Sequence, residues 1–209
     1  MKIHISNFEN GARVSYKNAF CVPTGEGGIT FGNNRNPHVK WSEFPENTKS
    51  FALICVDPDV PSVGDDVNQE GKWVPYNLPR VDFYHWVLVD IPVSITEIED
   101  GAVSSGITER GKATGNTEFG VTGINDYTGW FAGDANMSGN YGGYDGPCPP
   151  FNDERIHHYH FKIFALDTES LHLNGVFDGR QAMEAIKPHI IDSAEWIGTY
   201  TLNKNLISK

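Results

Sequence analysis

The sequence predicts a mainly β protein, with two packed layers of strands and a helix near the C-terminus. Turn-forming residues are frequent, with 22 glycines and 12 prolines among 209 residues. The apolar runs between them are short and rich in Val, Ile, Phe and Tyr, as is typical of strands. Helical periodicity is clear in one segment alone. The length fits a single domain over residues 1–209.

The strands are expected where apolar residues cluster between turn residues. These segments are Ile3–Ile5, Ala19–Val22, Ser50–Asp57, Phe83–Ile91, His157–Leu166 and Gly198–Leu202. In the third of them, the run from Phe51 to Val56 is apolar on both faces. That pattern indicates a strand in the centre of a two-layered structure.

The helix is expected over Asp178–Lys187. Asp178 can cap its first turn, and an apolar face is formed by Ala182, Met183 and Ile186. Pro188 then ends or bends it. A second short helical turn is expected over Asp192–Trp196. The segment 93–144 contains 11 glycines and few apolar residues, so it predicts long loops, which in a compact domain are usually functional or mobile.

Charge and composition exclude several classes of partner. The chain has 16 Lys and Arg against 27 Asp and Glu, a net charge of −11, which disfavours binding to nucleic acid and to anionic lipid. The apolar runs are too short to span a membrane, and residues 1–20 offer no signal-peptide core. The three cysteines cannot all be bridged within one chain. That odd count predicts a reducing compartment, and we expect a cytoplasmic protein.

Common enzyme signatures are missing. The chain has no complete phosphate-binding loop, no dinucleotide fingerprint, no nucleophile elbow and no H-E-x-x-H zinc motif. We therefore expect no cofactor and no metal. Three short stretches rich in Asp, His, Tyr and Pro carry the remaining information.

The first stretch is Asp57-Pro58-Asp59-Val60-Pro61, directly after an apolar strand. Proline lacks an amide donor and has a fixed φ, so we expect the strand to stop there and both carboxylates to lie in a rigid turn. Such carboxylates can position a ligand. The alternative is that Asp57 and Asp59 only accept hydrogen bonds from turn amides.

The second stretch is the expected strand around His85. Strict alternation would place His85 on one face with Phe83, Val87 and Val89, and would place Tyr84, Trp86, Leu88 and Asp90 on the other. A histidine among core residues is usually structural unless other polar groups converge on it.

The third stretch supplies such groups. A stiff loop, Gly146-Pro147-Cys148-Pro149-Pro150, precedes the strand that begins at His157. Alternation turns His157 and Tyr159 inward and leaves His158 and His160 on a solvated face. A metal site made of these histidines is disfavoured, because no strand face carries three ligands and an acidic residue at a recognisable spacing.

Together the three stretches resemble the phosphatidylethanolamine-binding protein family, in particular its bacterial Raf kinase inhibitor-like branch. The matching motifs are D-P-D-x-P at 57–61, the aromatic-histidine strand at 84–89, and G-P-x-P-P at 146–150 followed by H-x-Y at 157–159. The segments at 164–167 and 196–200 also resemble the bacterial pattern. The resemblance covers about residues 50–202.

The resemblance implies an antiparallel β-sandwich with one or two peripheral C-terminal helices. It also implies an anion-binding pocket formed by Asp57, His85, His157 and Tyr159, with Cys148 and Pro149 at its rim and Asp59 bracing the turn. Three features depart from the family: residues 151–156 contain no glycine, His158 stands where the family has an arginine, and the loop between Pro61 and Phe83 is long and acidic.

These residues lead to two main hypotheses. The first is a non-enzymatic module that binds a small anion, such as phosphate, a phosphoethanolamine-like head group or a carboxylate, and modulates a protein partner such as a kinase. The second is a hydrolase that uses His157 or His85 as base with Asp57 as orienter, or a bound metal; Cys148 is the only candidate nucleophile. A third is a vestigial pocket, with protein binding through the glycine-rich loops 101–146. Bacterial relatives suggest a homodimer.

Overall fold

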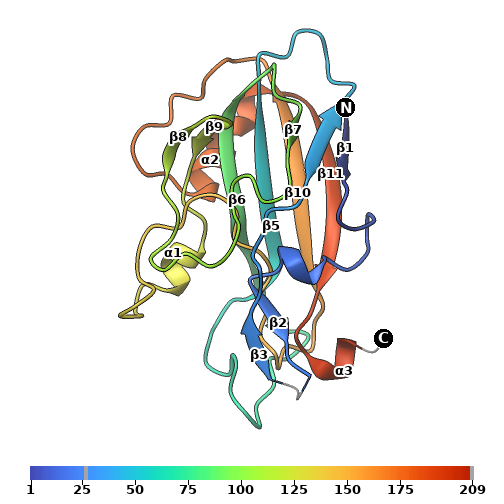
Figure 1. Ribbon diagram of the computed structural model, residues 1–209, viewed down its shortest axis with the longest axis vertical. Coiled ribbons are helices and arrows are strands. Elements are labelled where there is room, and N and C mark those ends of the chain that lie inside the picture. Colours follow the sequence, from blue (N-terminus) through green and yellow to red (C-terminus); the bar gives the residue numbers. More distant parts are fainter. Residues whose placement is uncertain (26–27, 208–209) are drawn as a thin grey trace.

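The structure is a computed structural model that describes residues 1–25 and 28–207. A six-stranded antiparallel sheet forms its centre, with the strand order β11-β10-β5-β6-β9-β8 (Figure 1). Its strands are β5 (Ser50–Pro61), β6 (Arg80–Pro92), β8 (Gly115–Thr117), β9 (Gly120–Thr122), β10 (His157–Leu166) and β11 (Ile190–Tyr200).

A smaller antiparallel sheet packs against one face of the large sheet. It has the order β1-β4-β7 and consists of β1 (Lys2–Ile5), β4 (Val39–Ser42) and β7 (Glu97–Ile98). The remaining two strands, β2 (Cys21–Pro23) and β3 (Ile29–Phe31), pair separately. The predicted mainly β, antiparallel fold is confirmed.

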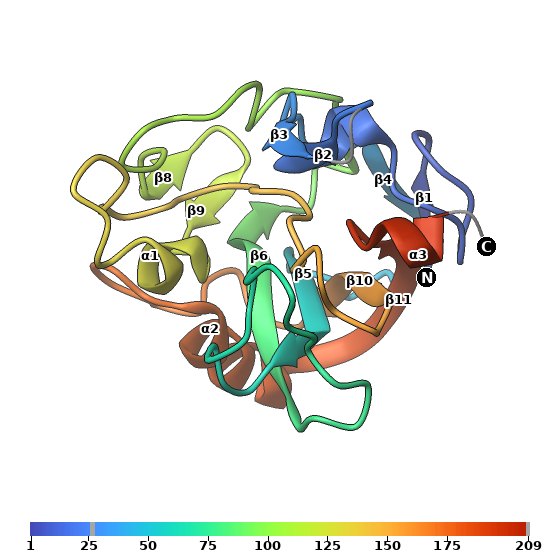
Figure 2. The ribbon, with the colours of Figure 1, turned by 90° about the horizontal axis from the view of Figure 1, so that it is seen from below.

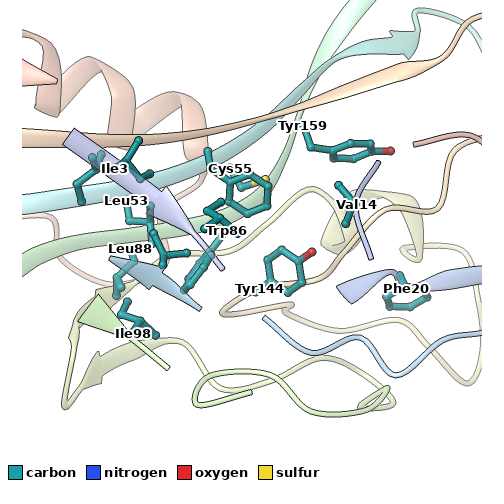
Figure 3. Packing of buried hydrophobic residues seen from close by; sticks show 14 of the residues in the cluster. Ile3, Val14, Phe20, Leu53, Cys55, Trp86, Leu88, Ile98, Tyr144 and Tyr159 are labelled. Atoms are coloured by element: carbon teal, nitrogen blue, oxygen red, sulfur yellow. The ribbon is translucent and has the colours of Figure 1, made fainter. Parts of the chain in front are cut away.

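The main core lies between the two sheets. Ile3 and Ile98 of the small sheet meet Leu53, Trp86 and Leu88 of the large one in a single buried cluster (Figure 3). A second, smaller core lies on the other face of the large sheet, under helix α2 (Gly179–Ile186). Both faces of β5 are therefore buried, which explains its doubly apolar sequence.

Helix α2 matches the expected helix closely. Asp178 caps it, accepting a hydrogen bond from the Gln181 amide at 2.8 Å, while the Gln181 side chain accepts from the Asp178 amide at 3.0 Å. This reciprocal pair is a capping box. A 3-10 turn, η2 (Lys187–His189), contains Pro188 and leads into β11. The other helical segments are short: η1 (Tyr16–Asn18), α1 (Tyr127–Trp130) and α3 (Lys204–Ile207).

The second helical turn, predicted over Asp192–Trp196, is wrong. These residues belong to β11, which pairs with β10 from His157↔Tyr200 onward, so the last strand also begins earlier than predicted. Pairing with β10, from Phe161↔Trp196 to Ala165↔Asp192, gives these residues backbone hydrogen bonds in place of those of a helical turn. Tertiary context therefore overrides the local pattern.

The prediction that the strand stops at Asp57 is also wrong. Strand β5 continues to Pro61, and its pairing steps from Asp57↔Phe83 to Val60↔Val81. Pro58 and Asp59 of β5 thus lie opposite the single residue Asp82 of β6, which is a β-bulge. The bulge accommodates prolines because it interrupts the regular ladder of amide donors.

A second bulge changes the predicted alternation of β6. Cys55 pairs with Trp86 while Val56 pairs with Tyr84, so His85 is the extra residue. Trp86 then lies in the main core and Val87 in the core under α2. The prediction that His85 shares a face with Val87 and Val89 is therefore wrong, because the bulge shifts the alternation by one residue.

Two of the three cysteines form a disulfide, Cys21–Cys148, and Cys55 is a buried free thiol. The odd count of cysteines therefore does not mean that all are reduced. Disulfides are typical of oxidising compartments, so the argument for a reducing one loses its basis, and the cytoplasmic location stays a prediction. Within residues 1–25 and 28–207, no helix is long and apolar enough to cross a bilayer.

Candidate functional site

A cavity of about 340 Å³ lies at one end of the large sheet. Figure 2 looks at this end and shows α1, the strands β2 and β3, and the 62–79 loop arranged around the ends of β5 and β6. Segments far apart in the sequence meet here because the strands that carry them are neighbours in the sheet.

The cavity lining contains Asp57, His85, His157 and Tyr159, as well as Cys148 and Pro149. The first four are almost fully buried, with exposed fractions of 0–3%. Six of the seven residues predicted for the pocket therefore converge on one cavity. The seventh, Asp59, is not part of the lining.

His157 lies between two carboxylates. Its Nδ1 is 2.7 Å from Asp57 Oδ2, and its Nε2 is 3.1 Å from Asp153 Oδ2. Burial lowers the pKa of His157, but the two negative charges outweigh burial and raise the pKa to about 9. The imidazole is therefore a cation at neutral pH, and both of its nitrogens are occupied.

Arg80 completes this buried network. Its guanidinium donates to both oxygens of Asp153, at 2.5 and 3.0 Å, and to the backbone carbonyl of Asp59 at 2.8 Å. Burial raises the pKa of Asp153, but the hydrogen bonds from His157 and Arg80 outweigh it and lower the pKa. Asp57, His157, Asp153 and Arg80 thus alternate in charge and sum to zero.

His85 is held in a different way. Its Nδ1 lies 2.7 Å from the backbone carbonyl of Asp145, which can only accept, so Nδ1 carries the proton. Burial lowers the pKa of His85 and outweighs the nearby Asp57. The ring is therefore neutral at pH 7. Its Nε2 has no hydrogen-bond partner in the described part of the chain.

Asp145 fixes the backbone that holds His85. Its buried carboxylate accepts hydrogen bonds from Asn34 at 2.7 Å, from Asn125 at 2.8 Å and from Lys112 at 2.6 Å. Its own amide donates to the carbonyl of His85 at 3.0 Å. The imidazole is thus oriented by a rigid second layer of residues.

Asp59 braces the structure beside the cavity. Its Oδ2 accepts from the amide of His158 at 3.0 Å and lies 2.8 Å from His158 Nδ1, and its Oδ1 accepts from Arg155 at 3.1 Å. The Asp59 amide donates to Asp57 Oδ1 at 2.8 Å. His158 and Arg155 thus both contact the Asp59 carboxylate.

The model of one sequence family, phosphatidylethanolamine-binding protein, matches residues 4–201. The chain belongs to the phosphatidylethanolamine-binding protein family. It is 31% identical to the YbcL protein of Escherichia coli (strain K12) over 173 residues, which cover 82% of this chain and 74% of YbcL. It is 30% identical to a UPF0098 protein of Methanothermobacter thermautotrophicus over 169 residues, covering 81% and 84% of the two chains.

Solved structures agree with this family assignment. The crystal structure of Escherichia coli YbcL, described as a new member of the mammalian PEBP family, superposes with a TM-score of 0.68 at 26% identity. The superposition covers 96% of this chain and 97% of YbcL. A phosphatidylethanolamine-binding protein homologue from Chlamydia trachomatis, at 24% identity and a TM-score of 0.63, covers 95% of both chains and shares the fold.

In this member of the phosphatidylethanolamine-binding protein family, six aromatic side chains line the cavity beside Tyr159. They come from the residue before β2, from β3, from β6 and from the region of α1, and they are Phe20, Phe31, Phe83, Tyr127, Trp130 and Phe131. Burial raises the pKa of Tyr127 and of Tyr159, and nearby carboxylates raise both further. Both phenols therefore remain protonated donors at neutral pH.

Sequence reasoning missed Asp153, Arg80, Asp145 and Tyr127. All four lie in or next to irregular segments, where no periodicity indicates which side chains turn inward. Asp153 lies four residues before His157, and this short separation is the one sequence feature that could have indicated their contact. Arg80 follows Pro79 at the start of β6, and no sequence motif indicates that its side chain turns toward Asp153.

No metal-ligand group lies in the cavity among residues 1–25 and 28–207. One group of three candidate ligands, His38, Glu97 and Glu99, lies on the small sheet, with ligand atoms within 4.8 Å of one another. Lys40 Nζ is 3.7 Å from Glu97, so a cation is already present there.

Proposed function

We propose that this protein binds a small ligand with a singly charged phosphate or carboxylate head in the cavity and does not transform it. The supporting observation is the convergence of Asp57, His85, His157 and Tyr159, all buried, on one cavity. A buried polar atom without a partner is costly, and His85, which is bonded through Nδ1, has no partner for Nε2 among the described residues, so its place in the cavity lining indicates a ligand.

The head group would meet three donors. Tyr159 offers its hydroxyl, and His85 offers Nε2–H once it is protonated. Cys148 has the only amide N–H in the segment 147–150, and that N–H donates to no acceptor in the described part of the protein. Asp57 can accept only, so it favours a protonated phosphate oxygen or an ammonium group on the same ligand.

The charge of the cavity favours a monoanion. The lining contains no Lys or Arg, and the cation at His157 is balanced by carboxylates. Protonation of His85 would supply the positive charge that an anion needs. Because the pKa of free His85 is lowered by burial, affinity for an anion should rise as the pH falls.

The hydrolase hypothesis is weakened by two contacts. His157 has both nitrogens against carboxylates, so neither is free to take a proton from water. Cys148 is bonded to Cys21, so the one candidate nucleophile is not a thiol. His85 Nε2 is then the base that an enzyme would need. We propose binding without catalysis.

Calorimetric titration with acetate at pH 6 and pH 8 tests the proposal. Acetate keeps one charge at both values, whereas phosphate monoesters lose a second proton near ~6. We expect affinity to fall by up to about tenfold per pH unit as His85 loses its proton. Equal acetate affinity at both pH values would exclude the role of His85, and no binding of acetate, phosphate or phosphoethanolamine would exclude the function.

Two variants sharpen the test. His85→Gln should remove most of the pH dependence, and Tyr159→Phe should weaken binding at both pH values. His189→Gln is the matched control, because His189 is partly exposed and lies beside Asp167, past the end of β10 opposite to His157. A kinase or other protein partner, a homodimer and a cytoplasmic location stay predictions.

A further inference from the structure

The cavity is larger than a phosphate or acetate ion. We call the end formed by Asp57, His85, His157 and Tyr159 its polar floor. Its volume of about 340 Å³ falls in the range of pockets that hold drug-sized molecules, roughly 300–1,000 Å³. Phosphate or acetate would occupy only the end formed by Asp57, His85, His157 and Tyr159. The rest of the space must be filled by another part of the ligand or by water.

The outer part of the cavity has no charge to offer. Apart from Asp57 and His157 on the floor, no lining residue carries a charge at neutral pH. The mouth instead exposes Phe31, Val63 and Trp130, with exposed fractions of 58%, 51% and 55%. They come from β3, the 62–79 loop and α1, three separate segments, and exposed apolar groups around a cavity mark a binding site. The body of the ligand should therefore be uncharged and apolar.

The rings of the wall are fixed relative to one another. Phe20 stacks on Tyr127 with centroids 4.5 Å apart and an interplanar angle of 18°, and Tyr127 stacks on Phe131 at 5.8 Å and 20°. Phe31 stands nearly perpendicular to Phe20 at 5.6 Å, and Phe83 nearly perpendicular to Tyr127 at 5.2 Å. The wall thus contains ring faces and ring edges in a rigid arrangement.

Such a wall suits a flat ring better than an alkyl chain. Aromatic pairs favour offset-stacked and edge-to-face contacts, and these add to the effect of burying apolar area. The ring stack is already formed without a ligand, so a bound ring needs little rearrangement of the wall.

We propose that the ligand is an aromatic monoanion, an aryl phosphate or aryl carboxylate. Its charged head lies against His85 and Tyr159, and its ring lies against the aromatic wall between Phe31 and Trp130. The proposal rests on the proposed binding function and specifies the class of ligand.

The test compares three phosphate monoesters, methyl, cyclohexyl and phenyl phosphate, by calorimetry at pH 5, which is about one unit below their second pKa of ~6, so that all three are mainly monoanions. We expect phenyl phosphate to bind at least tenfold more tightly than methyl phosphate, because it buries an apolar body. It should bind about 2- to 10-fold more tightly than cyclohexyl phosphate, which has similar size but no ring electrons. Trp130 fluorescence should change with phenyl phosphate.

Variants locate the ring. Trp130→Leu and Phe31→Leu keep an apolar side chain and should weaken phenyl phosphate severalfold while leaving methyl phosphate unchanged. Trp73→Leu is the matched control, since Trp73 is 53% exposed and does not line the cavity. Both test positions are exposed, so the variants should fold.

The outcomes separate this proposal from the proposed function. If methyl phosphate binds and phenyl phosphate binds no more tightly than methyl or cyclohexyl phosphate, the aromatic proposal is overturned and anion binding stands. If none of the three binds, both fail. Equal losses of phenyl phosphate affinity in Trp73→Leu and Trp130→Leu would also overturn the placement of the ring.

Discussion

His157 Nδ1 lies 2.7 Å from Asp57 Oδ2, and this contact joins two strands where their backbone pairing has ended. The last backbone pair of β5 with β10 is Val56↔His160. Past this pair, the contact between the Asp57 and His157 side chains connects β5 to β10. The same contact makes His157 a permanent cation at neutral pH and places Asp57 at the floor of the cavity.

Replacing His157 should destabilise the protein in a pH-dependent way. Its folded pKa of about 9 lies above the ordinary 6.5, so its stabilisation is complete below pH 6.5 and is lost as the pH rises through 9. His157→Gln breaks a buried ion pair, which typically costs about 3–5 kcal/mol. Urea unfolding at pH 6 should show this loss, and at pH 9.5 the loss should be smaller.

The control for that prediction is His189→Gln. His189 pairs with Asp167 at 2.8 Å, but the two side chains are 41% and 50% exposed, so the pair should contribute about 0–1 kcal/mol. A loss for His157→Gln that is the same at both pH values would contradict the assigned cation.

Asp59 should stabilise the fold at neutral pH and cease to do so in acid. Burial raises the pKa of Asp59, but hydrogen bonds from His158 and Arg155 outweigh burial and lower it. The stabilisation is therefore present above the unfolded pKa of 3.8 and is lost as the pH falls through the folded pKa. Asp59→Asn should cost about 1–3 kcal/mol at pH 7 and less at pH 3, by urea unfolding.

Asp65→Asn is the comparison for Asp59, because Asp65 is an exposed aspartate in the neighbouring loop. We expect it to change the free energy of unfolding by less than about 0.5 kcal/mol. If both variants behave alike, Asp59 does not brace the end of β5.

The Cys21–Cys148 disulfide should contribute strongly to stability. It links residues separated by 127 positions, and closing a loop of that size reduces the entropy of the unfolded chain by an equivalent of about 4–5 kcal/mol. The Cys21→Ser/Cys148→Ser double variant should lose a stability of this order in urea unfolding. Peptide mapping without reductant should show the linked pair and an unlinked Cys55. Alkylation of all three cysteines without reductant would contradict the disulfide.

Gly146 should tolerate no side chain. A Cβ at this position would overlap the backbone carbonyl of Asn18, while the Gly146 amide donates to Asn34 at 2.8 Å and its carbonyl accepts from Tyr127 at 2.8 Å. Gly146→Ala should therefore cost about 1–3 kcal/mol and lower the melting temperature by several degrees. Gly133→Ala is the control, since a Cβ there meets open space, and equal shifts would refute the explanation.

Much of the fold could be predicted, because alternation of apolar residues and helix-capping residues are visible in short segments of the sequence. The strand at His157–Leu166 was placed with the observed bounds, and Asp178 was identified as the helix cap. Inward His157 and Tyr159 and outward His158 followed from simple alternation in an undistorted strand.

Prediction failed where neighbouring strands impose an irregularity. The bulge at His85 and the one after Asp57 are properties of the pairing between β5 and β6, and the sequence of one strand alone does not show them. The helical turn expected at Asp192–Trp196 failed for a related reason, since its residues are taken up by pairing with β10.

The sequence by itself determined the β class, the family and six of the residues that line the cavity, because strand alternation and short motifs are local properties. Only the tertiary structure decided what those residues can do. It placed Asp153 against the second nitrogen of His157, Asp145 behind His85 and Cys21 against Cys148. The charge state and the free hydrogen-bonding groups of a side chain depend on such neighbours in space. Burial strengthens these interactions because the interior screens charges less than water does.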